Sequence, residues 1–297
     1  MLLELDNISK SFGAQIVLSD VSFSIDKGEV VGFLGTNGAG KSTTMRIITG
    51  LINADCGIVR VMGEVVGESG AKLRKHIGYL PEHNPLYTDL YVREYLSYVA
   101  DSYGVKGKKK RIAELVEMTK LTTEQGKKIG TLSKGYKQRL GLAQALMNNP
   151  KVLILDEPMS GLDPNQLEEM RSLIRHLSIG KTVLLSSHIM QEIEYTCSRV
   201  LIINKGSLVA DKSIDKLATM KNKKYVEVEF LDELSFEEEN LFFQFESIKQ
   251  DGRHYVFVSE RDIRSEVFRI ASSNNLVILT MMLQKESLES SFKILTS

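Results

Sequence analysis

The chain has 297 residues, which is enough for one large domain or for two, with a sizeable buried core. Its 38 basic and 38 acidic residues give a formal net charge of +0, which excludes a global electrostatic attraction to nucleic acid or anionic lipid. Cys56 and Cys197 stand far apart without metal-ligand spacing, so we expect buried, reduced thiols of a cytoplasmic chain rather than a disulfide.

The N-terminal stretch MLLELDNISKSFG lacks the basic start, apolar middle and small-residue cleavage site of a signal peptide, and we expect a strand there. The longest apolar stretches, such as LVILTMML at 276–283, are shorter than the roughly 20 residues that a membrane-spanning helix needs. We therefore expect that another subunit brings this chain to any membrane at which it works.

Residues 29–49, EVVGFLGTNGAGKSTTMRIIT, combine a β-branched run, a glycine-rich turn and a segment of helical character. Within them, GTNGAGKS at 35–42 matches GxxxxGK[ST] in the strand, loop and helix context that this motif requires. The backbone N–H groups of such a loop surround a polyphosphate, Lys41 would reach its terminal phosphates, and Ser42 would coordinate Mg²⁺. A chance glycine-rich turn is the alternative, and the strand and helix around the motif argue against it.

Residues of about 90–149 carry apolar side chains at helical spacing and predict a helical insert. Its basic run GVKGKKKR at 104–111 is expected to be a solvated loop and helix start rather than a phosphate or lipid contact. Near the end of the insert, in TLSKGYKQRLGLAQAL at 131–146, Ser133 stands at an N-cap position. A capped helix N-terminus can bind an anion, although this signal is weak by itself.

The runs VLIL at 152–155 and TVLL at 182–185 are short, apolar and unalternating, as strands buried on both faces of a parallel sheet should be. The first ends in two carboxylates that strand alternation points in different directions. We expect Asp156 to face Mg²⁺ and Glu157 to act on an attacking water as a general base. A pair of solvent-facing strand-end acids is the alternative.

Beyond about residue 215, the segments KYVEVEF and HYVFV, separated by the acidic FEEEN, predict a second, smaller domain.

Together these motifs resemble those of the ATP-binding subunits of ABC transporters, over about residues 1–215. The resemblance implies an α/β P-loop NTPase fold of ABC type with an antiparallel β subdomain and the helical insert, and residues 216–297 would be a small α/β accessory domain. It implies an ATPase that uses ATP and Mg²⁺ and works as a head-to-tail dimer with an integral membrane permease. We expect no nucleic-acid partner and a peripheral location on the inner face of the cell membrane.

The family's site residues map onto this chain by motif. Ser133 and Gly135 fall on the signature motif that contacts the γ-phosphate bound by the opposing subunit. The segment SGLD at 160–163 resembles the D-loop near the dimer interface, His188 resembles the switch histidine, and Phe12 resembles the aromatic residue that stacks on adenine. The resemblance assigns catalysis to Lys41, Glu157 and His188, Mg²⁺ to Ser42, Glu82 and Asp156, and the nucleotide to Phe12, Gly35, Thr36, Asn37, Gly38, Ala39, Gly40, Lys41, Ser42, Thr43, Ser133, Gly135 and Asp163.

Three departures from the family pattern stand out. The signature reads LSKGY instead of LSGGQ, and we expect the side chain of Lys134 to point to solvent. Tyr91 replaces a threonine that often caps the first insert helix, and Asp89 could serve instead. Glu82 replaces the usual glutamine of the loop that faces the membrane subunit. A glutamate oxygen can still bind Mg²⁺, but it adds a third carboxylate beside the phosphates, so we predict an unusually strong dependence of ATP binding on Mg²⁺.

Two stretches, YLPEHNPLY and LSKGYKQRLGLAQAL, resemble the gliding-motility-associated ABC transporter ATP-binding subunits of Bacteroidetes. The tail SLESSFKILT at 287–296 resembles the ending of a wider group of export-type ATPases that includes drug and lipid exporters. A soluble ABC ATPase acting on ribosomes or DNA is an alternative of another class. Such proteins usually carry two motif sets or a long coiled coil, whereas this chain has one set and a modest insert. A structural protein with an inactive site ranks last, because each catalytic role has a chemically competent residue.

Overall fold

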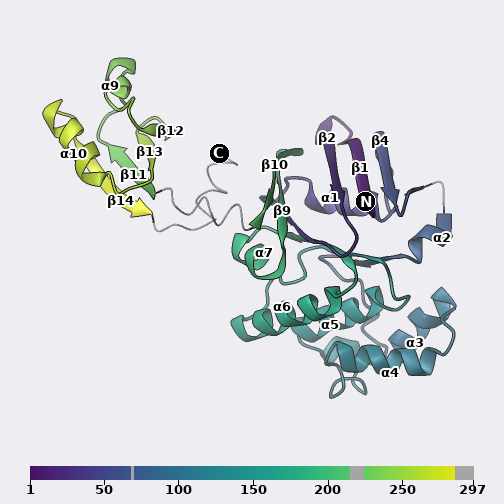
Figure 1. The fold of residues 1–297 in the computed structure, drawn as a ribbon. Helices are drawn as coiled ribbons and strands as arrows, with labels where there is room; N and C mark the ends of the chain where they lie inside the picture. Colours follow the sequence, from purple (N-terminus) through teal and green to yellow (C-terminus); the bar gives the residue numbers. More distant parts are fainter. Residues whose placement is uncertain (68–69, 215–223, 285–297) are drawn as a thin grey trace. The chain divides into compact units, whose positions relative to one another are not determined.

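The computed structural model describes residues 1–67, 70–214 and 224–284 (Figure 1). The chain divides into two compact units, Met1–Lys212 and Ser213–Ser297. The tail motif at 287–296 lies outside the described residues.

The centre of the first unit is a six-stranded sheet in the order β10-β9-β3-β8-β7-β6. The pairs β9–β3, β3–β8, β8–β7 and β7–β6 are parallel. Every residue of β7 and β8 is buried, which confirms the expectation of strands covered on both faces. The strands of this sheet are β3 (Val30–Leu34), β6 (Ile77–Leu80), β7 (Val152–Leu155), β8 (Thr182–Ser187), β9 (Arg199–Asn204) and β10 (Ser207–Ser213).

A second, antiparallel sheet in the order β2-β1-β4-β5 covers part of the same core. Its side chains join those of β3 and α1 in one buried cluster, in which the ring centroids of Phe23 and Phe33 lie 5.7 Å apart. The expected burial of both thiols is wrong for Cys56, which is exposed at the start of β4, whereas Cys197 is buried. The strands are β1 (Leu3–Phe12), β2 (Gln15–Ile25), β4 (Cys56–Val61) and β5 (Glu64–Val65).

The helical insert forms as predicted, and its first helix begins at Val92 with Tyr91 as the N-cap residue. The Glu94 carboxylate accepts a hydrogen bond from the Tyr91 N–H at 3.1 Å, so half of a capping box persists and Asp89 is not the cap. No helix in the described part of the chain is both long and apolar enough to cross a bilayer. The helices of this unit are α1 (Lys41–Ile48), α2 (Gly70–Arg74), α3 (Val92–Tyr103), α4 (Lys108–Met118), the 3-10 turn η1 (Ile129–Thr131), α5 (Lys134–Ala145), α6 (Pro164–Ser178) and α7 (Met190–Thr196).

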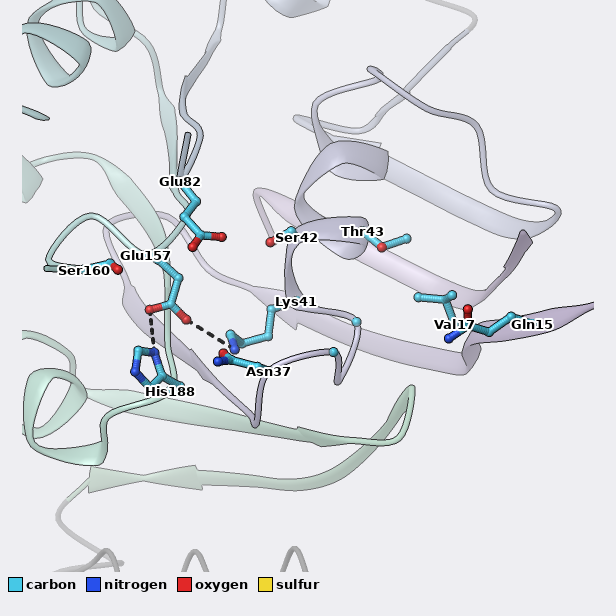
Figure 2. Close-up of a pocket in the computed structure, with 12 residues that line it drawn as sticks. Gln15, Val17, Asn37, Lys41, Ser42, Thr43, Glu82, Glu157, Ser160 and His188 are labelled. Carbon is cyan, nitrogen blue, oxygen red and sulfur yellow. Dashed lines mark hydrogen bonds and ion pairs between the residues drawn. The ribbon is translucent and has the colours of Figure 1, made fainter. Parts of the chain in front are cut away.

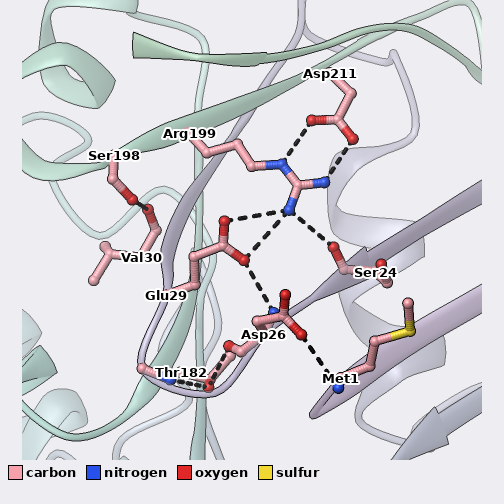
Figure 3. A network of polar contacts seen from close by, with 10 residues as sticks. Met1, Ser24, Asp26, Glu29, Val30, Thr182, Ser198, Arg199 and Asp211 are labelled. Carbon is pink, nitrogen blue, oxygen red and sulfur yellow. Dashed lines mark hydrogen bonds and ion pairs between the residues drawn. The ribbon is translucent and has the colours of Figure 1, made fainter. Parts of the chain in front are cut away.

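A polar network ties the two sheets together where the parallel strands begin (Figure 3). The Arg199 guanidinium donates to both carboxylate oxygens of Asp211 at 2.6 Å and to Glu29 at 3.2 Å. These acidic partners raise the pKa of Arg199. At the start of β8, the Thr182 hydroxyl accepts from the Gly28 N–H and donates to the Asp26 carbonyl, each at 3.0 Å. The network therefore fixes the edge of the parallel sheet at which β8 and β9 begin. Helix α1 begins at the opposite edge, after the end of β3.

The second unit has the element order β–α–β–β–α–β, and its antiparallel sheet is ordered β12-β13-β11-β14. This is the arrangement of ferredoxin-like domains. An apolar core that includes Val228, Phe257 and Val267 lies between the sheet and α10. The elements are β11 (Lys224–Phe230), α9 (Phe236–Asn240), β12 (Glu246–Asp251), β13 (His254–Ser259), α10 (Arg264–Ser273) and β14 (Ile278–Gln284).

Candidate functional site

The glycine-rich loop at 35–40 connects β3 to α1 and cannot carry bulkier side chains at two of its positions. A Cβ at Gly35 would lie 2.6 Å from the Ile203 carbonyl oxygen. Gly40 has φ +108, and a Cβ there would lie 2.5 Å from Leu18 Cδ2 and 3.0 Å from the Val17 carbonyl oxygen. Gly40 is also the N-cap residue of α1 and has no side chain to satisfy the first N–H groups of the helix. The loop and the helix start therefore form an anion-binding cradle.

A cavity of about 600 Å³ opens above this loop, which is large enough for a nucleotide. In Figure 2, Glu82 points into it from the loop after β6, opposite Ser42 at the start of α1. Most of the cavity wall is polar or glycine. The residues lining it are Gln15, Val17, Asn37, Gly38, Gly40, Lys41, Ser42, Thr43, Glu82, Glu157, Ser160 and His188.

A buried ion pair joins Lys41 and Glu157 at the floor of the cavity (Figure 2). Their side chains are 6% and 7% exposed, and Lys41 Nζ lies 3.2 Å from Glu157 Oε1. Lys41 Nζ also donates to the carbonyl oxygens of Gly35 and Thr36, and His188 Nδ1 lies 2.9 Å from Glu157 Oε2. Breaking such a pair without replacement leaves an uncompensated buried charge, so an incoming anion at Lys41 must replace the Glu157 carboxylate.

The backbone of Glu157 is in the left-handed region, with φ +47. For a residue with a side chain this conformation costs of order 1–3 kcal/mol and is common at functional sites. Beside it, Asp156 is 1% exposed and accepts a hydrogen bond from Ser186 Oγ at 2.7 Å. Both residues follow the end of β7, and only Glu157 lines the cavity.

The donor set fits Mg²⁺ bound partly through phosphates. Among the described residues no cation forms an ion pair with the buried Asp156 carboxylate, which leaves a buried charge that a metal ion would balance. The described residues also contain no group of three or more His, Cys, Asp or Glu that could hold a metal by itself. Mg²⁺ characteristically takes one or two carboxylates plus substrate phosphates, and Asp156, Ser42 and Glu82 supply hard oxygen atoms of this kind.

Several predicted site residues lie outside this cavity. Phe12 is 52% exposed at the end of β1, where Lys10 Nζ lies 5.4 Å from its ring centroid, and it does not line the cavity. The loop residues Gly35, Thr36 and Ala39 shape the cradle without lining it, and Asp156 lies beneath its floor. Ser133, Gly135 and Asp163 also do not contribute to its wall.

Ser133 and Asp163 instead begin two neighbouring helices. Ser133 Oγ accepts from the Tyr136 N–H at the start of α5, which confirms the predicted N-cap. Asp163 Oδ1 accepts from the Gln166 N–H at 2.9 Å at the start of α6. A Cβ at Gly135 would lie 2.9 Å from Gln166 Oε1, so these two helix starts are packed closely. Lys134 is exposed, but its side chain does not extend away into solvent as expected, since its ammonium lies over Gly161.

The sequence interpretation missed four polar or lining residues. Gln15, Val17 and Ser160 line the cavity, and Ser186 contacts Asp156 beneath it. Ser160 stands in the SGLD segment already singled out, so its position was a usable signal. Gln15 and Val17 come from β2, and nothing in their local sequence marks them.

A comparison with family models matches residues 18–160 to the family described as ABC transporter. Among curated proteins, the chain is 34% identical to the bacitracin transport ATP-binding protein BcrA of Bacillus licheniformis over 296 residues, covering 98% of this chain and 96% of that protein. It is 40% identical to the linearmycin resistance ATP-binding protein LnrL of Bacillus subtilis, covering 70% of this chain and 68% of that protein.

Solved structures also match much of the chain. One, described as the ATP-binding subunit of an ABC transporter, is 32% identical with a TM-score of 0.67, covering 74% of this chain and 92% of that one. Another, a dimeric ATP-binding cassette in a post-hydrolysis state bound to ADP and Pi, is 26% identical with a TM-score of 0.66, covering 72% and 99%.

Proposed function

This chain belongs to the ABC transporter family as an ATP-binding subunit, an ATPase, and from that premise we propose that it powers export by a separate membrane permease. Its P-loop fold of ABC type confirms the predicted fold class. The observation that carries the export proposal is the similarity to BcrA, which extends over 98% of this chain and therefore across both units.

The name of BcrA states bacitracin transport, and another relative at 39% identity is named as a Nod factor export protein of Burkholderia orbicola. These names favour the drug or lipid exporter alternative. The gliding-motility assignment stays a prediction, since the relatives described above do not carry that name. The soluble ABC ATPase alternative is weaker, because transport, resistance and export are the functions that the relatives' names state.

The proposed reaction is in-line attack of water on the γ-phosphate of ATP, which is catalysed mainly by positioning and charge stabilisation. Lys41 and the loop N–H groups hold the phosphates. When Lys41 turns to them, it leaves the Glu157 carboxylate free to orient and deprotonate water, and His188 stays beside Glu157. Mg²⁺, held by Ser42, Asp156 and Glu82, would neutralise charge on the phosphates.

We further propose that ATP is shared between two copies of the chain. Ser133, Gly135 and Asp163 lie outside the cavity of their own chain and are therefore free to complete the cavity of a partner.

Residues 1–215 would be the ATPase domain, and residues 216–297 an accessory domain that regulates or supports the dimer. The chain would work at the inner face of the cell membrane through its permease, contacting it with the loop from His83 to Tyr91.

Copurification tests the export proposal. We expect the tagged chain, extracted from its native membranes with mild detergent, to recover an integral membrane protein. Tyr87→Ala in the proposed contact loop should reduce that recovery at least fivefold without changing ATP binding. Tyr195→Ala is the matched control, since Tyr195 is 58% exposed on α7 and Tyr87 is 56% exposed. Recovery of ribosomes or DNA in place of a membrane protein would overturn the proposal.

A further inference from the structure

Ser186 stands beside the two carboxylates of the site, on the strand next to the one that they follow. Strand β8 lies between β3 and β7, and Leu185 pairs with Leu155, the last residue of β7. The residues that follow this pair are Ser186, which is still in β8, and Asp156, which comes directly after β7. Ser186 is 0% exposed, and it lies two residues before His188.

The Ser186 hydroxyl bonds to both catalytic-site acids at once. Its Oγ donates to Asp156 Oδ1 at 2.7 Å and accepts from the Glu157 backbone N–H at 2.9 Å. A serine hydroxyl has only one proton to donate, and here Asp156 receives it. Because water is excluded at this depth, both contacts are stronger than they would be at the surface.

The neighbouring serine does something different. The Ser187 hydroxyl donates to the Glu192 carboxylate and accepts from the Ile189 N–H, so it holds the start of α7. Burial raises the pKa of Glu192. The two serines thus belong to separate hydrogen-bond networks, because successive side chains of a strand point to opposite faces of the sheet.

We propose that Ser186 is a positioning residue for ATP hydrolysis. By bonding Oδ1 of Asp156 it would leave the other carboxylate oxygen available to Mg²⁺, and by accepting the Glu157 N–H it holds that residue in its φ +47 conformation. That conformation places the Glu157 carboxylate between Lys41 and His188. The inference rests on the proposed hydrolysis mechanism and adds a residue that does not line the cavity.

The test compares variants that separate the hydroxyl from its packing. Ser186→Ala removes the hydroxyl group. Ser186→Thr and Ser186→Val introduce side chains of the same shape as each other, of which only threonine carries a hydroxyl. Thr182→Val is the matched control. Thr182 lies at the other end of β8 and is 1% exposed, and its hydroxyl also donates one hydrogen bond and accepts one (Figure 3). For each full-length variant, kcat and KM for ATP, thermal unfolding, and the Kd of a fluorescent ATP analogue with Mg²⁺ or EDTA are measured.

We expect Ser186→Ala to lower kcat at least tenfold, with the Kd in EDTA within twofold of the wild-type value. The gain in affinity on adding Mg²⁺ should fall at least threefold, because Asp156 is no longer oriented. Ser186→Thr should exceed Ser186→Val in kcat at least fivefold. Thr182→Val should keep kcat within twofold, even with a lower unfolding temperature.

The inference is overturned if Ser186→Ala keeps more than half of the wild-type kcat and its full Mg²⁺ gain. It is equally overturned if the threonine and valine variants lose activity alike, or if Thr182→Val loses as much kcat as Ser186→Ala. The binding measurements need no turnover and no membrane partner. A failure to copurify a permease would therefore count against the proposed function alone.

Discussion

At the scale of a residue, Glu82 is a departure from the family pattern for which we propose a retained role in binding Mg²⁺. It is exposed in the loop after β6 and lines the cavity that also contains Ser42 and Glu157. With Asp156 beneath the floor, three carboxylates surround the space proposed for the phosphates. Without a divalent cation, these negative charges repel the nucleotide.

Glu82→Gln should therefore weaken the dependence of ATP binding on Mg²⁺. We expect the ratio of the Kd in EDTA to the Kd in Mg²⁺ to fall about fivefold, equivalent to about 1 kcal/mol, chiefly through tighter binding in EDTA. Titration calorimetry with both buffers measures the ratio. Glu64→Gln is the control, since Glu64 is exposed on β5 outside the cavity lining. An unchanged ratio in Glu82→Gln would show that the extra charge has no such effect.

At the scale of elements, the loop after β6 is tied to α5 by a close contact. Asn84 Nδ2 donates to the Lys137 carbonyl oxygen at 3.3 Å and lies directly over Gly141. A Cβ at Gly141 would overlap the Asn84 amide and Leu80 Cδ1. The helix that Ser133 caps is therefore packed against the loop that carries Glu82.

Gly141→Ala should disturb this contact. We expect the free energy of unfolding to fall by about 1–3 kcal/mol, as for other overpacked sites, and kcat to fall because Glu82 is displaced. Chemical denaturation and ATPase assays measure the two effects. Adding Asn84→Ala should restore part of the stability by removing the closest overlap. Gly126→Ala, where a Cβ meets nothing within 4 Å, should leave both quantities unchanged.

A double variant as unstable as Gly141→Ala alone would show that Asn84 is not the group displaced. The effect would then belong to Leu80, the other side chain within overlap distance.

At the scale of the whole molecule, the residues proposed to bind ATP lie in two places that do not meet within one chain. Its cavity contains Lys41, Glu157 and His188, whereas Ser133 and Gly135 lie outside the cavity wall. Cassettes of this family form dimers, and one matched structure is a dimeric cassette with ADP and Pi. ATP binding and pairing of two copies should therefore be linked.

Glu157→Gln tests this linkage. The amide cannot act as general base, so we expect turnover to fall by about 10²–10⁴-fold. It also removes the ion pair with Lys41, so ATP should bind at least as tightly as to the wild-type chain. Sedimentation velocity with MgATP should show an accumulated dimer that disperses when nucleotide is removed. Normal hydrolysis by this variant would refute the role of Glu157, and a monomer at saturating ATP would refute the shared site.

The sequence by itself determined the elements whose signal is local. The P-loop motif, the buried strands ending at Leu155 and beginning at Thr182, the N-cap at Ser133 and the helical insert all follow from residue types at short spacing. The resemblance added the ABC-type fold, because its motifs occur in a fixed order. The exposure of Cys56 escaped prediction, since burial depends on neighbours that are remote in the chain.

Only the tertiary structure decided how these elements meet. Strand β8 is inserted between β3 and β7, and this parallel pairing brings Ser186 to Asp156 across 30 residues of sequence. The same folding closes Glu157 onto Lys41 and packs Asn84 against Gly141. Such contacts arise from sheet order and register, and no periodicity within one segment encodes which segment lies beside it. The motifs therefore identify the chemistry, and the fold decides which further side chains hold it in place.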